Sequence, residues 1–263
     1  MEVVSVDENN NKILGFEPVL RNSKIQFKGK NNVLICEENV KLSGSNIKFH
    51  GDNSIVYLAP PKYFYYLNIS LFHNCVMFFD EHVSMNGVLN LSLSEEKNII
   101  IGQDCLFSFG IWMRLANPHL IYDANDMQRT SLTESIIIGD HVWVGQDSLI
   151  MKGARIGSGS IIAAKSVVPN KKIPSNNIWG GNPVRKIKSD IFFDKLTSNL
   201  FTKESAKKHQ TFESEKWIYK NEGGVIDIKE LDERLSSAAD LDEKIELLVG
   251  LRNYKSHNRF YME

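Results

Sequence analysis

The amino-acid sequence predicts a mainly β chain wound into a parallel β-helix, and three observations support this prediction. Branched aliphatic residues recur at every sixth position, small or β-branched residues stand four positions after most of them, and a polar segment interrupts the pattern once. A period of six fits neither an α-helix nor one long strand, but it fits a triangular coil with three short strands per circuit. The aliphatic side chains would then point inward, and stacked circuits would lie ~4.8 Å apart, the ordinary spacing between strands.

The period is clearest in the middle of the chain, where β-branched residues suit strands and Gly, Asn and Asp suit corners. The aliphatic positions are Ile138, Val144, Ile150, Ile156, Ile162 and Val168. The small or β-branched positions are Val142, Ser148, Ala154, Ser160 and Ser166. We therefore expect regular coils over residues 99–188.

Upstream of these coils the period is weaker. The segment from Ile101 to Phe107 has the same form, which places Cys105 at a small inward position. We therefore interpret Cys105 as a packing residue rather than a nucleophile. Residues 1–98 are interpreted as irregular early coils, so that residues 1–188 form one β-helical domain.

The segment 112–135 is polar and lacks the period. It is predicted to be a loop extruded from the helix between two coils. A long loop in a compact repeat domain is usually functional, so catalytic residues are sought there first.

Residues 189–263 are predicted to form a C-terminal extension with a helical hairpin. Asp227 and Asp240 each precede an amphipathic pattern and suit helix N-caps. Three uses of such an extension stay open: it could cap the end of the β-helix, join subunits or dock a partner enzyme.

Composition narrows the function classes. Apolar residues make up 42% and charged residues 24% of the chain, and the formal net charge is −1, so neither nucleic acid nor an anionic membrane is an expected partner. The most apolar stretch, residues 63–79, is broken by polar residues, so no membrane span is expected. No secretory signal is visible at the start, and three widely spaced cysteines indicate free thiols, so we expect a cytoplasmic protein.

Three motifs between residues 117 and 188 resemble motifs of the hexapeptide-repeat acyltransferases. They are Asn117-Pro118-His119-Leu120-Ile121-Tyr122-Asp123, Ile138-Gly139-Asp140-His141-Val142-Trp143-Val144-Gly145, and Gly181-Asn182-Pro183-Val184-Arg185-Lys186-Ile187-Lys188. The pattern is most similar to bacterial O-acetyltransferases of sugars, including those of capsule and polysialic acid chains. The resemblance implies a left-handed β-helix and a homotrimer.

The resemblance places the catalytic base at His119. Histidine titrates near neutrality and suits removal of a hydroxyl proton during acyl transfer. Its orienting partner stays open between Asn117, Asp123 and a backbone carbonyl. The resemblance also places Trp143 beside the acetyl group. His141, at a coil corner, is expected to be exposed and not catalytic.

A cationic strip supports acetyl-CoA as co-substrate. No Asp or Glu occurs between Ser148 and Ser189. The same stretch carries eight basic residues: Lys152, Arg155, Lys165, Lys171, Lys172, Arg185, Lys186 and Lys188. Such a strip suits the phosphates of coenzyme A. The resemblance implies that the coenzyme contacts Trp143, Gly145, Ala163, Ala164, Lys171, Arg185, Lys186 and Lys188.

Two departures from the family pattern bear on the site. Leu120 stands where the family loop often has proline, and Asn170 stands where a lysine contact to the coenzyme is usual, so Lys171 or Lys172 would substitute. The predicted function is O-acetylation of a carbohydrate acceptor. N-acetylation of an amino sugar or nucleotide sugar, and a non-catalytic β-helical scaffold, are the alternatives. No metal is expected, because a β-helical carbonic anhydrase needs three histidine ligands and His119 and His141 do not supply them.

Overall fold

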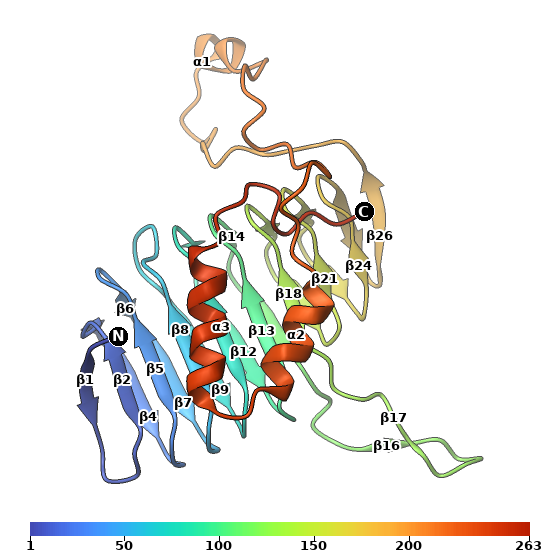
Figure 1. Cartoon of the computed structure of the whole chain (residues 1–263). Helices are drawn as coiled ribbons and strands as arrows, with labels where there is room; N and C mark the ends of the chain where they lie inside the picture. Colours follow the sequence, from blue (N-terminus) through green and yellow to red (C-terminus); the bar gives the residue numbers. More distant parts are fainter.

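The computed structural model describes residues 1–263, and it forms a parallel β-solenoid with three sheets as its sides (Figure 1). The nine-stranded sheet runs in the order β1 (Val3–Val6), β2 (Lys12–Gly15), β5 (Val33–Cys36), β8 (Ile55–Leu58), β10 (Val76–Phe79), β13 (Asn98–Ile101), β18 (Ile136–Ile138), β21 (Arg155–Ile156) and β24 (Lys172–Ile173). Its strands are parallel except β1, which pairs antiparallel with β2 at the N-terminal edge. The fold class predicted from the six-residue period is confirmed.

The other two sides follow in chain order around each coil. The six-stranded sheet contains β11 (Ser84–Met85), β14 (Leu106–Phe107), β19 (Trp143–Val144), β22 (Ile161–Ile162), β25 (Ile178–Gly181) and β26 (Val184–Lys188). The seven-stranded sheet contains β4 (Lys24–Phe27), β7 (Asn46–Phe49), β9 (Leu67–Leu71), β12 (Leu89–Leu93), β15 (Trp112–Arg114), β20 (Leu149–Met151) and β23 (Val167–Val168). A short pair, β3 (Val19–Arg21) and β6 (Lys41–Ser43), completes the early coils.

The predicted aliphatic positions form the core of the solenoid. All six, from Ile138 to Val168, are fully buried in one large apolar cluster, and Ile138 is the register partner of Ile156 in the next coil. The small positions between them are buried as well. Successive coils thus place similar side chains directly above one another in the core, as the period predicts.

The early coils are longer than the later ones but not irregular. Register partners in the nine-stranded sheet are 21 or 22 residues apart between Lys12 and Asn98, against 17 or 18 between Ile137 and Lys172. Their strands have three to five residues, apart from the two-residue β11, whereas most later ones have two or three. The expectation of irregular coils was therefore wrong, because a search for a period of six misses a period of 22.

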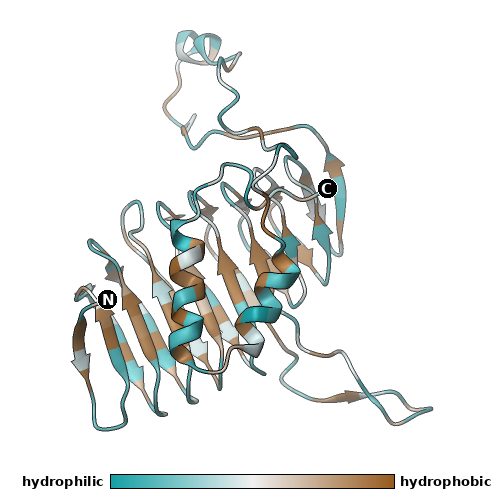
Figure 2. Cartoon of the chain, viewed as in Figure 1, coloured by the Kyte–Doolittle hydropathy of each residue, from teal (hydrophilic) through white to brown (hydrophobic).

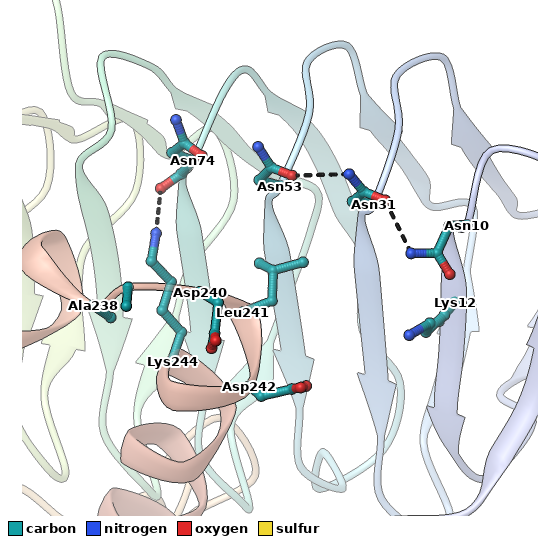
Figure 3. Close-up of a pocket in the computed structure, with 11 residues that line it drawn as sticks. Asn10, Lys12, Asn31, Asn53, Asn74, Ala238, Asp240, Leu241, Asp242 and Lys244 are labelled. Atoms are coloured by element: carbon teal, nitrogen blue, oxygen red, sulfur yellow. Dashed lines mark hydrogen bonds between the residues drawn. The ribbon is translucent and has the colours of Figure 1, made fainter.

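A ladder of asparagines marks this longer period. Asn10, Asn31, Asn53 and Asn74 occupy the same corner of four successive coils, each with a left-handed φ between 54° and 59° that asparagine tolerates well. Asn10 donates a hydrogen bond to Asn31, and Asn31 donates one to Asn53 (Figure 3). Between this ladder and the start of α3 lies a polar cavity of about 390 Å³.

The excursion from the solenoid begins later than predicted. Trp112–Arg114 form β15 and pair with β12 and β20, so the coil continues through them. The cause is Met113, which is fully buried and continues the inward ladder from Phe107 at the six-residue spacing. Residues 116–134 then leave the body and form a hairpin of β16 (Ile121–Tyr122) and β17 (Arg129–Thr130) (Figure 1).

The C-terminal helices lie along the nine-stranded sheet rather than over an end of the solenoid (Figure 1). These are α2 (Ile228–Ser237) and α3 (Leu241–Asn253), with Asp227 and Asp240 as their N-caps. Both helices carry hydrophobic and hydrophilic residues (Figure 2), and Leu235, Leu248 and Leu251 are buried in a second apolar cluster together with residues of the sheet. The sheet is therefore covered on both faces, which explains strands in which every residue is buried.

A buried ion cluster fastens the last residues of the chain to the solenoid. The fully buried Arg259 donates to both oxygens of Asp140, at 2.7 and 2.8 Å, and to Asp80 at 2.5 Å. Its remaining N–H groups donate to the carbonyls of Leu251 and Tyr254. Every donor of the guanidinium therefore has an acceptor, which is the condition for a buried charge to be tolerated.

The remaining helix, α1 (Lys203–Lys208), lies on an arm that projects away from the solenoid (Figure 1). None of the three helices has the length and apolar character that a membrane crossing requires.

Candidate active site

One outward column of the six-stranded sheet joins two predicted site residues. Trp143 is the register partner of Ile161, Ile161 of Ile178, and Ile178 of Lys188. Three strand spacings, or about 14 Å, separate the Cα atoms of Trp143 and Lys188. The column therefore has an aromatic side chain at one end, aliphatic ones in the middle and a cation at the other end.

The indole of Trp143 is half-buried and held in place. Its Nε1–H donates to Ser108 Oγ at 3.3 Å, and its ring lies 5.8 Å from that of Phe193. One face of the side chain therefore packs against protein, while the rest faces the outside of the sheet.

Gly145, Ala163 and Ala164 lie at the adjoining corner, where successive coils stack closely. A Cβ on Gly145 would stand 2.6 Å from the Ala164 nitrogen, and one on Gly180 would stand 2.8 Å from the Ala163 Cβ. Gly145 is thus required by the stacking itself. The small side chains leave the corner flat, so that a ligand could approach the backbone.

The predicted basic residues gather at the C-terminal end of the solenoid. Arg185, Lys186 and Lys188 are exposed on β26. The Lys171 ammonium lies 5.3 Å from the centre of the Trp179 ring, and Trp179 is the register partner of Lys186. None of these four cations forms an ion pair, so all are free to bind an anionic ligand.

His119 lies elsewhere on the same chain. It is exposed on the excursion, which leaves the corner between the seven-stranded and nine-stranded sheets. That corner is opposite the six-stranded sheet in a triangular coil, and Figure 1 shows β16 and β17 at the lower edge, with β14 and β26 at the upper. One chain therefore does not bring His119 and Trp143 together.

The two predicted side-chain partners of His119 are engaged with other groups. Asn117 donates to Ser131 Oγ at 2.9 Å, and Asp123 accepts from the backbone and side chain of Asn125. These bonds lower the pKa of Asp123. Neither side chain orients His119 within this chain. Of the three alternatives, a backbone carbonyl therefore remains.

The expectation for His141 was wrong, because this side chain is fully buried. Its two ring nitrogens lie 2.8 Å from Asp104 and 2.9 Å from the Phe193 carbonyl oxygen. Its ring is stacked between Trp217, at 3.6 Å, and Phe193, at 4.1 Å. The segment after residue 190 folds over this corner. The sequence of the repeat itself does not predict the contact of His141 with Phe193 and Trp217.

Lys195 from the same segment completes the contact. Its ammonium lies 2.6 Å from Asp104. Burial raises the pKa of Asp104, but hydrogen bonds from His141 and Lys195 outweigh it, and the pKa is lowered overall. The sequence did not predict this cluster of Asp104, His141 and Lys195, which holds Phe193 beside Trp143.

The cysteines are packing residues, as predicted for Cys105. All three are free and buried. Burial raises the pKa of Cys36 to about 12 and that of Cys75 to about 11. Cys105 is fully buried and its thiol points to the Gly139 carbonyl at 3.1 Å. None of them is poised as a thiolate nucleophile.

Comparison with known proteins supports the fold and the acyltransferase family. Residues 135–170 match the family model described as bacterial transferase hexapeptide (six repeats). A polysialic acid O-acetyltransferase of Neisseria meningitidis is 27% identical over 190 residues, which are 66% of this chain and 86% of that protein. The crystal structure of the polySia-specific acetyltransferase NeuO superposes with a TM-score of 0.65 at 29% identity, covering 78% of this chain and 96% of that one.

The chain is related to the hexapeptide-repeat acyltransferases. A putative lipopolysaccharide biosynthesis O-acetyl transferase of Escherichia coli K12 is also similar, at 28% identity over 46% of this chain and 65% of that protein. These homologues are all acetyltransferases, so this relative of theirs is an acyltransferase that uses an acyl-CoA. The residues matched by the family model include Trp143 and Ile161 of the column.

Proposed function

We propose that this acyltransferase moves the acetyl group of acetyl-CoA to a hydroxyl of a cell-surface or capsular polysaccharide. The column from Trp143 to Lys188 supports the proposal most directly. Its aliphatic middle suits the pantetheine arm, and Lys188, with Arg185 and Lys186 beside it, suits the phosphates. Trp143 would then cover the thioester, with its aromatic face against the acetyl group. Such a reaction would take place in the cytoplasm, where acetyl-CoA is made.

His119 is proposed as the general base. It takes the proton of the acceptor hydroxyl as that oxygen attacks the acetyl carbonyl carbon. The C–S bond then breaks, the coenzyme leaves as a thiolate, and the proton held by His119 passes to the sulfur. The acetyl ester and free coenzyme A are the products, so no further reactant is needed.

A homotrimer with shared sites, which the family resemblance implies, is part of this proposal. His119 and Trp143 lie on different sides of one chain, and a second copy that supplies one of them would complete the site. The nine-stranded sheet is covered by α2 and α3, which leaves the other two sheets and the excursion for contacts between copies. Large apolar side chains are exposed on the excursion, among them Leu120 and Tyr122, each at 56%. Apolar exposure of this kind suits a subunit interface.

Subunit mixing tests the shared site. His119→Ala subunits are mixed in equal amounts with subunits carrying both Arg185→Ala and Lys188→Ala, under conditions that exchange subunits. In a cyclic trimer each mixed assembly regains one complete site, so about a quarter of the wild-type activity is expected.

The matched control is each variant mixed with itself, which should stay inactive. Exchange is verified by mass measurement on tagged subunits. Activity that remains at the level of the separate variants, despite proven exchange, would place base and coenzyme contacts on one chain. A fully active monomer would also show that the base and the coenzyme contacts lie on one chain.

An acceptor array tests the reaction itself. Transfer of radiolabelled acetyl from acetyl-CoA is measured on bacterial polysaccharides, amino sugars and nucleotide sugars. The proposal expects labelling of a polysaccharide, with the label released by mild alkali, since esters are cleaved there and amides are not. Alkali-stable label on an amino sugar would indicate N-acetylation, and no label on any acceptor would favour a non-catalytic scaffold.

A further inference from the structure

A polar track runs along the outward face of the seven-stranded sheet and ends below the excursion. Lys48, Ser70, Ser92 and Arg114 are successive register partners, each on its own strand. Residues between them along the strands, such as Ile69, are buried, so the four side chains point outward. Hydroxyls thus lie between two basic residues whose Cα atoms are three strand spacings, or about 14 Å, apart.

A second column of amides flanks this track. Asn46, Asn68 and Asn90 are register partners, and Asn68 donates to Asn90 at 3.0 Å. The column continues to Trp112, whose side chain is 44% exposed. Amides beside hydroxyls and an aromatic ring are the groups that bind the hydroxyls and the apolar faces of sugar rings.

The cations of the track are not neutralised by the protein. Neither Lys48 nor Arg114 forms an ion pair. Glu95 lies near Arg114 but is held by Arg129 at 2.7 Å. Burial, followed by the charges of Lys28 and Lys48, lowers the pKa of His50 on the same sheet.

A cavity of about 370 Å³ lies where the track meets the excursion. Phe72, Ser92, Ser94, Glu95 and Arg114 line it, together with residues 116–118, which directly precede His119, and Glu95 is paired with Arg129. The ring of Phe72 is 42% exposed and stacks on that of His50, with 5.3 Å between the ring centres. The cavity therefore combines an aromatic platform, hydroxyls and a free guanidinium next to the proposed base.

We propose that this track and cavity bind the acceptor as an extended glycan whose sugars carry carboxylates. Arg114 pairs with a carboxylate, for which its two parallel N–H groups are suited, and Phe72 stacks on a sugar ring. Lys48 pairs with a second carboxylate further along the chain. Because the Cα atoms of these two basic residues are about 14 Å apart, an oligosaccharide binds through both and a monosaccharide through one. The inference rests on the proposed function for its acceptor class.

Binding without acetyl-CoA tests this site separately from the transfer reaction. Titration calorimetry compares hexamers of sialic, glucuronic and galacturonic acid with the same hexamers after reduction of each carboxylate to an alcohol. At least one carboxylated hexamer should bind tenfold or more tightly than its reduced form, and more tightly than its monosaccharide. Arg114→Gln should remove that tenfold preference, and Lys48→Gln should remove the advantage of the hexamer over the monosaccharide.

Arg234→Gln is the matched control, since Arg234 is exposed on α2 on another side of the solenoid and forms no ion pair. It should leave every affinity unchanged. Equal binding of carboxylated and reduced hexamers, or a preference that survives Arg114→Gln, would overturn the assignment. If carboxylated hexamers bind as expected but no polysaccharide is acetylated, the assignment of the track as a glycan-binding site is supported and the proposed transfer reaction is contradicted.

Discussion

Replacing His119 by alanine is expected to lower kcat by roughly 10²–10⁴, the usual contribution of a general base. Without the imidazole, the acceptor hydroxyl must lose its proton to water as it attacks the thioester. The KM for acetyl-CoA should change little, because the cationic end of the proposed coenzyme column is on another part of the chain. Initial rates with saturating acetyl-CoA and the acceptor identified on the array measure the change.

The variant should fold normally, since the His119 side chain is exposed and makes no side-chain hydrogen bond in this chain. An unchanged melting temperature and oligomeric mass would establish this. His73→Ala is the matched control, because His73 is also an exposed histidine, with 65% of its side chain accessible. A His119→Ala enzyme within threefold of wild type would remove His119 from the mechanism.

Replacing Arg259 by methionine should lower the free energy of unfolding by about 3–5 kcal/mol, the usual result of removing one partner from a buried ion pair. Asp80 and Asp140 are almost wholly buried, and both would lose their shared cation. The carbonyls of Leu251 and Tyr254 would lose their donors as well. Denaturant titration followed by circular dichroism measures the loss.

A second variant separates charge from packing. Asp80 keeps Arg252 and Lys255 at 3.3 Å, whereas Asp140 loses its only cation. Adding Asp140→Asn to Arg259→Met removes this uncompensated carboxylate, so part of the lost stability should return. Arg234→Met, on the exposed side of α2, is the control and should change stability by less than about 0.5 kcal/mol. A loss below about 1 kcal/mol in Arg259→Met would show that the cluster contributes little to stability.

The sequence predicts the later coils well because the stacking itself creates the period. Each inward position faces the same environment in every coil, so Ile138, Ile156 and their equivalents must be similar. The early coils obey the same rule with longer strands, and their period of 22 was visible in Asn31, Asn53 and Asn74. It was missed because only the period of six was sought.

The sequence predicts which residues belong to the candidate site, but it does not predict how they are arranged in space. Motifs locate His119 and Trp143 in the chain, but their separation depends on which corner the excursion leaves, and a pattern read along one strand does not contain that. His141 was misplaced for a related reason. Its burial depends on Phe193 and Trp217, whose contacts with the repeat span dozens of residues and leave no periodic signal.

The C-terminal segment changes how the solenoid behaves as a repeat. In a stack of coils each unit contacts its neighbours alone, so the ends can fray independently and folding can begin anywhere. Here Arg252 of α3 binds Glu37 at 2.6 Å, 215 residues earlier in the chain, and Arg259 spans from Asp80 to Asp140. These contacts tie the segment from Arg252 to Arg259 to coils that lie far apart along the stack. We therefore expect the coils between Glu37 and Asp140 to unfold together rather than one at a time.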